Sequence, residues 1–496
     1  MTATTEAPAP GLDRGLVALG VVVVLGAIMS IVDATAVNVA TRTLAEDFGA
    51  SITSVQWVLT GYMLGLAGVI PITGWATERF GARRVWIAAL ALFLAGSALA
   101  GAAWSMPSLI AFRVVQGLGG GMILPVAQTI LAQAAGPARM GRIMGFIGVP
   151  LLLGSVAGPI IGGLIVSTGG WRWIFFANLP LGAAAIAAAF RLMPRSVPRP
   201  SRLDVRGLVL LCGGVTLFVY GTTEAGSPGA LDAPRTWTIL GTAAVLIGLY
   251  VLHARRRQAL IDIALFRDRG FAAAAVTNVV VAVALFGVLL LLPLYWQVVR
   301  GHGPLATGLL LAPQALGAAV ATPLAGRLTD RLGAGAVVPA GIVLGLLGTA
   351  AYTQVGADTS PVLLAVALFV IGLGLGATIM PSLAAAYEAL PGALIPRATS
   401  AVNTLQRMGA SVGTTALAVI LQHAITVRTP ARAGSALAPL PEPARVAVAP
   451  VLADAFAHAF WIALIIGVFA LVPALLLPRR ATSARPASAP DRQDGT

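Results

Sequence analysis

Long apolar blocks, rather than a period of two or of 3.6 residues, dominate the pattern of hydrophobic and polar positions along the chain. A helix needs about 20 predominantly apolar residues to cross a bilayer. The pattern predicts fourteen spanning helices, at residues 15–38, 56–77, 84–103, 107–133, 143–166, 173–192, 205–225, 236–253, 271–295, 304–325, 336–356, 361–387, 398–421 and 455–477. We expect the first block to span the membrane and not to be a signal peptide, because it is too long and lacks a small-residue cleavage site.

Composition and charge also favour a polytopic membrane protein. Of 496 residues, 58% are hydrophobic and 10% are charged, whereas soluble domains carry about 25% charged residues. The net charge is +14, and all of the Lys+Arg positions are arginine. These arginines lie mainly in short segments between the apolar blocks. This distribution orients helices in a bilayer and does not indicate a nucleic-acid partner. The single cysteine, Cys212, excludes a disulfide framework or a thiolate metal centre.

The arginine distribution predicts the orientation. Placing both termini in the cytoplasm assigns most arginines to the inside, including those of "RFGARR", "GPARMGR" and "HARRRQALIDIALFRDR". We expect a multi-pass protein of a bacterial cytoplasmic (inner) membrane, because arginine-only basic usage and abundant alanine are typical of GC-rich bacterial genomes. The longest external segment, 426–453, is either a partly ordered loop or a short interfacial helix. The composition of 479–496 predicts a disordered tail.

An internal repeat predicts the architecture. The segment "PITGWATERFGA" from Pro71 matches "PLAGRLTDRLGA" from Pro323 without a gap; the first copy follows the second block and the other follows the tenth. Two six-helix bundles separated by two extra helices give this offset, and duplicated bundles are typical of transporters. The predicted fold class is an all-α polytopic membrane protein, divided into a cytoplasmic tail 1–14, an N-terminal bundle 15–193, two extra helices 194–270, a C-terminal bundle 271–478 and a cytoplasmic tail 479–496.

Several motifs, in order along the chain, carry a resemblance to a known family. They are "IVDATAVNVA", "GWATERFGARR", "FRVVQGLGGGMILP", "GSVAGPIIGG" and "WRWIFFANLPLG". With these motifs the chain resembles the major facilitator superfamily, and within it the fourteen-span drug:proton antiporter branch. Glu78 stands where the loop motif of that family usually has aspartate. The resemblance implies the major facilitator fold and multidrug efflux, with antibiotic resistance as its consequence, driven by the proton motive force.

The segment "GSVAGPIIGG" is the antiporter motif in this resemblance. Its residues of interest are Gly154, Gly158, Pro159, Gly162 and Gly163. Glycines four residues apart share one helix face and allow a neighbouring backbone to approach closely, while the proline removes a backbone donor and bends the helix. This face is either a tight packing surface or a surface that rocks against its partner helix and seals the cytoplasmic side in one state.

The repeated loop motif places an acid beside arginines at the cytoplasmic ends of helices. The expected cytoplasmic clasp comprises Gly74, Glu78, Arg79, Gly81, Arg83 and Arg84 in the first copy, and Gly326, Asp330, Arg331 and Gly333, with Arg327, in the second. These charges either join the two bundles in the outward-open state or serve only as anchors that set the topology.

Ionisable residues inside the spans are the strongest functional candidates, because a charge at bilayer depth is costly unless it faces a cavity or a partner. Asp33 lies roughly 25 Å from the cytoplasmic end of its helix and Arg113 roughly 9 Å below the outer end of its own, at 1.5 Å per residue. These depths permit pairing. The pair either couples transport to protons, with a cationic substrate competing for Asp33, or is a structural ion pair.

Other candidates line the expected substrate cavity with Asp33. Gln116 shares a helix face with Arg113, and Arg407 lies in mid-span. Glu224 is either a solvated helix end or a further proton-coupling residue. The aromatic residues Trp57, Tyr62, Phe286, Tyr295 and Trp296 are candidates for a cage around planar cations, although Trp57, Tyr295 and Trp296 also suit interfacial anchors.

These features predict a transporter and not an enzyme. The sequence has no phosphate-binding GxxxxGK[ST] loop, and its four histidines are expected in loops or at helix ends without metal-ligand spacing. We therefore expect no metal and no cofactor, with the proton gradient as the energy source. The predicted function is proton-coupled export of amphiphilic or cationic drugs by a monomer. A dedicated exporter of one endogenous secondary metabolite and a facilitator-type importer remain alternatives, since a fold alone does not set direction.

Overall fold

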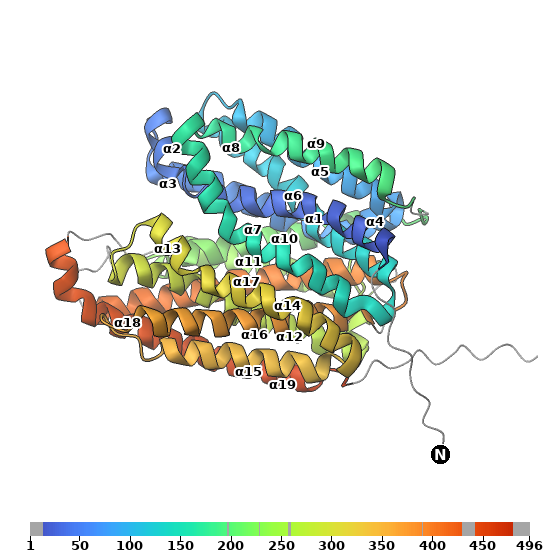
Figure 1. Ribbon diagram of the computed structural model, residues 1–496. Helices are drawn as coiled ribbons and strands as arrows, with labels where there is room; N and C mark the ends of the chain where they lie inside the picture. The colour runs from blue at the N-terminus through green and yellow to red at the C-terminus, as the bar shows by residue number, and fades with distance from the viewer. Residues whose placement is uncertain are drawn as a thin grey trace, which may run out of the picture.

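Two helical bundles lie one above the other in the computed structural model of the chain, with the first half of the chain in one bundle and most of the second half in the other (Figure 1). The structure describes residues 13–195, 198–227, 229–255, 259–388, 390–428 and 442–479. Within these ranges the regular elements are helices and no strand is present. The all-α polytopic fold class is thereby confirmed.

The N-terminal bundle contains six membrane-length elements. They are α1 (Arg14–Ala36), α3 (Ile52–Val69) continued by η1 (Ile70–Ile72) and α4 (Thr73–Phe80), α5 (Ala82–Gly101), α6 (Met106–Ala135), α7 (Met140–Gly169), and α8 (Arg172–Phe176) followed by α9 (Asn178–Leu192). A short amphipathic helix, α2 (Thr41–Phe48), follows α1, and the 3₁₀ turn η2 (Pro137–Arg139) links α6 to α7.

The C-terminal bundle has the same number of elements. They are α12 (Arg269–Leu294) ending in the π-helical turn η5 (Tyr295–Val299), α13 (Pro304–Leu310) with α14 (Ala312–Leu332), α15 (Ala334–Tyr352), α16 (Pro361–Glu388), α17 (Ile395–Arg428), and α18 (Glu442–Phe469) with α19 (Leu471–Leu475).

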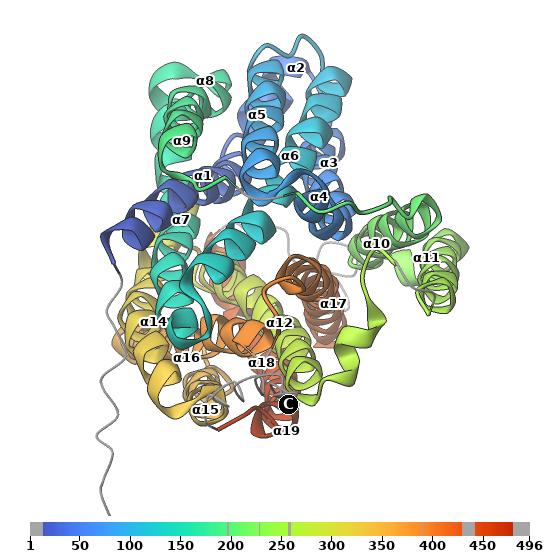
Figure 2. The same cartoon turned by 90° about the vertical axis from the view of Figure 1, so that its right-hand side faces the viewer.

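Two further helices lie at the side of the bundles, α10 (Val205–Ala225) and α11 (Pro234–His253), with short turns at η3 (Ala230–Asp232) and η4 (Ile263–Arg267). Figure 2 shows them beside α4 and α17. The helix α10 contacts both bundles: Gly68 of α3 packs against Thr216, and the Thr415 hydroxyl of α17 donates to the Thr222 carbonyl at 2.7 Å. The extra helices therefore flank the junction between the bundles.

Thirteen helices of the described residues are long and apolar enough to cross a membrane. The helix α7, whose 30 residues include several with undescribed side chains, is additional to these thirteen. The largest differences from the expected spans are α17, which continues to Arg428, and α18, which begins at Glu442. Helix thus extends into both ends of the segment 426–453, whereas 429–441 and most of the two terminal tails lie outside the described residues.

The buried apolar residues are distributed unequally between the two ends of the bundles. In the half that contains α4, one continuous core includes residues of both bundles, such as Met144 of α7 and Val402 of α17. In the opposite half the core is divided into one cluster in the N-terminal bundle, around Leu109, and another in the C-terminal bundle, around Phe456. The bundles therefore pack together at one end and have separate cores at the other.

Candidate functional site

The first contact between the bundles at the packed end is an ion pair between α4 and α17. The Glu78 carboxylate accepts two hydrogen bonds from Arg397, at 2.8 Å from Nε and 2.9 Å from Nη2. Both side chains are largely buried, with 10% and 20% exposed. A bidentate pair of this kind fixes orientation as well as distance.

The second contact has the same construction in the other copy of the repeat. Asp330, at the end of α14, accepts a hydrogen bond from the Gly141 backbone N–H at 2.8 Å, and its carboxylate lies 3.0 Å from Arg142 Nε of α7. In each case the acid of one bundle meets an arginine in the first turn of the fifth long helix of the other bundle. We call these two pairs the clasp, and the end of the molecule where they lie the clasp end.

The two acids were expected to pair with arginines of their own motif, but each pairs with an arginine of the other bundle. Four of the expected arginines have exposed side chains and no ion pair with these acids: Arg79, Arg84, Arg327 and Arg331. Arg83 instead donates to the Phe190 carbonyl at 2.7 Å and lies over the Phe190 ring. Arg79, Arg84, Arg327 and Arg331 are exposed at helix ends, whereas the acids turn toward the other bundle. The missed signal is an arginine at the start of each fifth helix, in "GRIM" and "PRAT".

Two physical constraints explain why the repeated loop motif contains glycines. Gly81 and Gly333 adopt φ values of 86° and 81° at the turns that follow the clasp acids, a conformation that favours glycine. Gly74 and Gly326 lie where the bundles touch. A Cβ atom at Gly74 would lie 2.9 Å from the Pro396 carbonyl oxygen, and one at Gly326 would lie 2.5 Å from that of Gly141.

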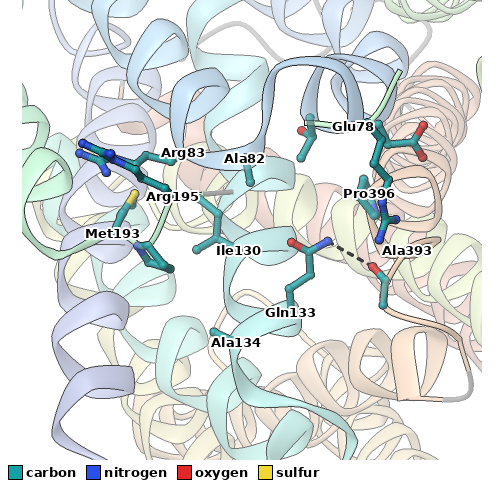
Figure 3. A pocket seen from close by; sticks show the side chains of 14 residues that line it. Glu78, Ala82, Arg83, Ile130, Gln133, Ala134, Met193, Arg195, Ala393 and Pro396 are labelled. Carbon is teal, nitrogen blue, oxygen red and sulfur yellow. Dashed lines mark hydrogen bonds between the residues drawn. The ribbon is translucent and has the colours of Figure 1, made fainter. Parts of the chain in front are cut away.

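A cavity of about 550 Å³ opens next to the Glu78–Arg397 pair. Figure 3 shows Arg83 and Arg195 on one side of this cavity and Glu78 on the other, with Gln133 donating to the Gly392 carbonyl at 3.1 Å. The cavity lies at the clasp end, between α4, α6, the segment after α9 and the connection from α16 to α17. It is separate from the ion pair inside the N-terminal bundle.

That ion pair joins α1 to α6. The Arg113 Nη1 atom lies 2.6 Å from Asp33 Oδ2, and both side chains are completely buried. The Asp33 Oδ1 atom accepts further hydrogen bonds from Gln116 Nε2 at 2.9 Å and Asn178 Nδ2 at 2.8 Å. The Arg113 guanidinium also lies 4.2 Å from the centre of the Tyr62 ring.

The partners of Asp33 suit a carboxylate. In the structure Asp33 accepts hydrogen bonds from three donors, those of Arg113, Gln116 and Asn178. Sequence reasoning missed Asn178, which also donates to Ser97 at 3.0 Å. Its only signal was its place in the motif at the start of the sixth long helix.

The expected substrate cavity is only partly assembled by the predicted residues. Arg407 lines a cavity between the bundles, whereas Asp33 and Gln116 do not. Phe286 is half-buried in α12, and Glu224, in the last turn of α10, is not part of the Asp33 network. Sequence spacing could not determine which face of each helix points toward the junction.

The aromatic cage is not formed. Tyr62 lies against Arg113, and Trp57 packs on Tyr220 of α10. Tyr295 and Trp296 are buried inside the C-terminal bundle, where Tyr295 contacts Phe456. These aromatic residues stabilise separate helix contacts, because their shared apolar character does not bring them to one place.

The glycine face of the antiporter motif packs against α1 of its own bundle. A Cβ atom at Gly158 would overlap the Thr35 hydroxyl, and one at Gly162 would lie 2.8 Å from Ala36. At Gly154 and Gly163 the same atom would make ordinary contacts, at 3.6 and 3.9 Å. In this conformation the face is a tight packing surface, and the seal at the cytoplasmic side in another state stays a prediction. The Pro159 side chain lies outside the described part of the chain.

We expect Gly158→Ala to disturb the α1–α7 contact, whereas Gly163→Ala, the matched control, has room for its methyl group. Overpacking of this kind costs about 1–3 kcal/mol. Thermal unfolding of the purified proteins measures the difference. A Thr35→Ala substitution in the Gly158→Ala background should restore only part of the stability. It removes the overlapping hydroxyl but leaves the Cβ of residue 35 at 2.9 Å and the Val32 carbonyl oxygen at 3.1 Å. Equal stability of the two single variants would contradict the observed close approach.

Comparison with known proteins identifies the family. The sequence profile of the Major Facilitator Superfamily matches residues 23–414. The "Multidrug resistance protein B homolog" of Mycobacterium tuberculosis (strain ATCC 25618 / H37Rv) is 39% identical over 498 residues, covering 96% of this chain and 92% of the relative. The chain belongs to the Major Facilitator Superfamily, and it is a multi-pass membrane protein of a family of transporters.

Other relatives extend this comparison. The "Tetracenomycin C resistance and export protein" of Streptomyces glaucescens is 29% identical, over 80% of this chain and 74% of the relative. Among solved structures, a double Trp mutant of XylE has a TM-score of 0.62 at 14% identity, covering 92% of this chain and 94% of that chain. The human organic anion transporter MFSD10 (TETRAN) has a TM-score of 0.61 at 14% identity, over 92% of this chain and 100% of that chain. The solved structures support the fold alone.

Proposed function

We propose that this protein exports amphiphilic small molecules in exchange for protons, by alternating access of a central site to the two sides of the membrane. The observation that carries the proposal is the unequal packing of the bundles. One clasped core closes one end, while the opposite end has two separate cores. The names of the relatives, which refer to multidrug resistance and export, agree with it.

Coupling in this proposal runs through Asp33. Its carboxylate is the acid of a fully buried network in the N-terminal bundle. Intramembrane acids that are paired in this way are typical of proton relays in transporters. Each charge that moves down a 100 mV gradient releases about 2.3 kcal/mol. This energy suffices for about 50-fold accumulation of a cargo, at 1.4 kcal/mol per factor of ten, and no other cofactor is needed.

The direct test is uptake into inside-out membrane vesicles with an acidic interior. We expect uptake of a drug-like dye that collapses when a protonophore is added. Uptake without proton dependence would contradict antiport, and accumulation only in right-side-out vesicles would favour an importer. If a dye panel is inactive and one endogenous metabolite is transported, the protein is a dedicated exporter.

The proposed orientation places the clasp end and both termini in the cytoplasm of a bacterial cell, with the protein acting as a monomer. Gly303 lies at the opposite end, and a Cβ atom there meets nothing within 4 Å. In a Cys212→Ala background we expect Gly303→Cys to react with a membrane-impermeant maleimide on intact cells. Arg267→Cys should react only after permeabilisation. Labelling of position 267 on intact cells would overturn the orientation.

A further inference from the structure

Arg407 is a cation in the middle of α17 that faces the junction between the bundles. It lines a cavity of about 60 Å³, together with Ser30 of α1, Pro125 of α6 and Asn403 of α17. Its side chain makes neither a hydrogen bond nor an ion pair with any residue that the structure describes. An arginine at bilayer depth is costly unless it meets water or an anion. The described part of the chain supplies no carboxylate partner for it.

The neighbouring polar groups of the described chain bond to other partners and not to Arg407. Asp33, on the facing helix α1, is enclosed by donors of the N-terminal bundle. The Ser30 hydroxyl is bonded to the Tyr62 hydroxyl at 3.0 Å, and Asn403 Nδ2 donates to Gln128 Oε1 at 2.7 Å. Arg407 is the only charged residue among those that line this cavity in the described part of the chain. The lining therefore carries one uncompensated positive charge.

The remaining lining is mainly apolar. It includes Ile31 of α1 and Leu66 of α3. A volume of about 60 Å³ is far below the roughly 300–1,000 Å³ of pockets that bind drug-sized ligands. In this conformation the bundles are thus too close for a drug-sized molecule. Cargo would reach Arg407 only when the bundles separate, in another state of the transport cycle.

We propose that Arg407 binds an acidic group of the cargo, so that the preferred substrates are apolar molecules with one carboxylate, phenolate or enolate. The proposal rests on the export function proposed above and assigns its substrate class. A guanidinium presents a planar fork of donors that matches an oxyanion, and it keeps its charge at any physiological pH. The preference is opposite to the cationic cargo that Asp33 suggests from sequence, because Asp33 is sealed by its own partners.

Binding of two xanthene dyes to the purified full-length protein tests the proposal. Carboxyfluorescein is an anion and rhodamine 123 is a cation of similar size, and fluorescence anisotropy measures the affinity of each. We expect wild type to bind carboxyfluorescein more tightly. Arg407→Gln should weaken that binding by at least about tenfold, the effect of losing one charge-assisted hydrogen bond, without weakening the binding of rhodamine 123.

Two further variants complete the design. Arg407→Lys keeps the charge and should retain part of the affinity for carboxyfluorescein. Arg428→Gln removes an arginine from the last turn of the same helix, where it donates to the Ala424 carbonyl, and should bind both dyes as wild type does. Size-exclusion chromatography of each variant verifies that the protein is folded.

The outcomes separate this inference from the proposed function. The inference is overturned if wild type does not bind carboxyfluorescein or prefers rhodamine 123. It is also overturned if Arg407→Gln binds carboxyfluorescein as tightly as wild type does. If Arg407→Gln loses affinity for both dyes equally and the pH dependence of binding shifts, the inference is also overturned and Arg407 is assigned to proton coupling. Anion binding through Arg407 without proton-dependent vesicle uptake supports the inference but removes the antiport function. Proton-driven uptake of rhodamine 123 alone, retained in Arg407→Gln, removes only the inference.

Discussion

Asp33→Asn is expected to abolish proton-driven accumulation while the protein still reaches the membrane. The substitution keeps the size of the side chain but removes both its charge and its ability to take up a proton. With a proton motive force of 100 mV, the accumulation ratio in inside-out vesicles should fall from about 50 toward one, according to the driving force of about 2.3 kcal/mol per charge. Exchange of labelled for unlabelled cargo without a gradient should persist, because movement of the bundles does not require titration.

The same substitution leaves Arg113 buried without its counter-ion, and breaking a buried pair typically costs about 3–5 kcal/mol. Its stability must therefore be measured separately. Asn178→Ala is the milder companion, because it removes one donor to Asp33 and no charge. We expect it to retain coupled transport, because Asp33 keeps its ion pair with Arg113 and the hydrogen bond from Gln116. Coupled export by Asp33→Asn with unchanged proton dependence would place coupling elsewhere.

The fold was largely predictable from the sequence because the bilayer constrains it strongly. Every spanning segment must satisfy its own backbone hydrogen bonds, so apolar blocks of sufficient length become helices. The repeat at Pro71 and Pro323 added the duplication of the bundles. The end of α17 and the start of α18 were less predictable, because polar residues interrupt the apolar pattern inside the helices. Examples are Gln422 and His423 near the end of α17 and Arg445 near the start of α18.

The site was predictable where depth alone decided the contact. Asp33 and Arg113 were paired from their expected depths, and they meet at 2.6 Å. Contacts that depend on helix rotation or on the approach of two bundles were not accessible in the same way. The sequence placed Arg79 next to Glu78, but the partner is Arg397, more than 300 positions further along the chain. Adjacent residues on a helix point in different directions, so sequence proximity misled.

Charge reversal in the clasp is expected to have a second large effect, on the closure of the clasp end. Glu78→Arg places two arginines together at the junction, and Arg397→Glu does the same with two acids. Each single substitution should open the clasp end, whereas the double variant re-forms the pair in reverse. Arg79→Glu is the matched control, because Arg79 lies next to Glu78 but is exposed and has no ion pair with a described residue.

Ser400 reports this opening directly. Its hydroxyl donates to the carbonyls of Ile70 and Pro71 across the junction, at 2.9 Å in each case, and it is fully buried. In a Cys212→Ala background, Ser400→Cys should react slowly with a maleimide added to inside-out vesicles. Each single charge reversal should raise that rate by about tenfold or more, which corresponds to a shift of about 1.4 kcal/mol between closed and open states. The double reversal should restore slow labelling. A fast rate in Arg79→Glu, or no recovery in the double variant, would mean that these charges set only the topology and do not hold the bundles together.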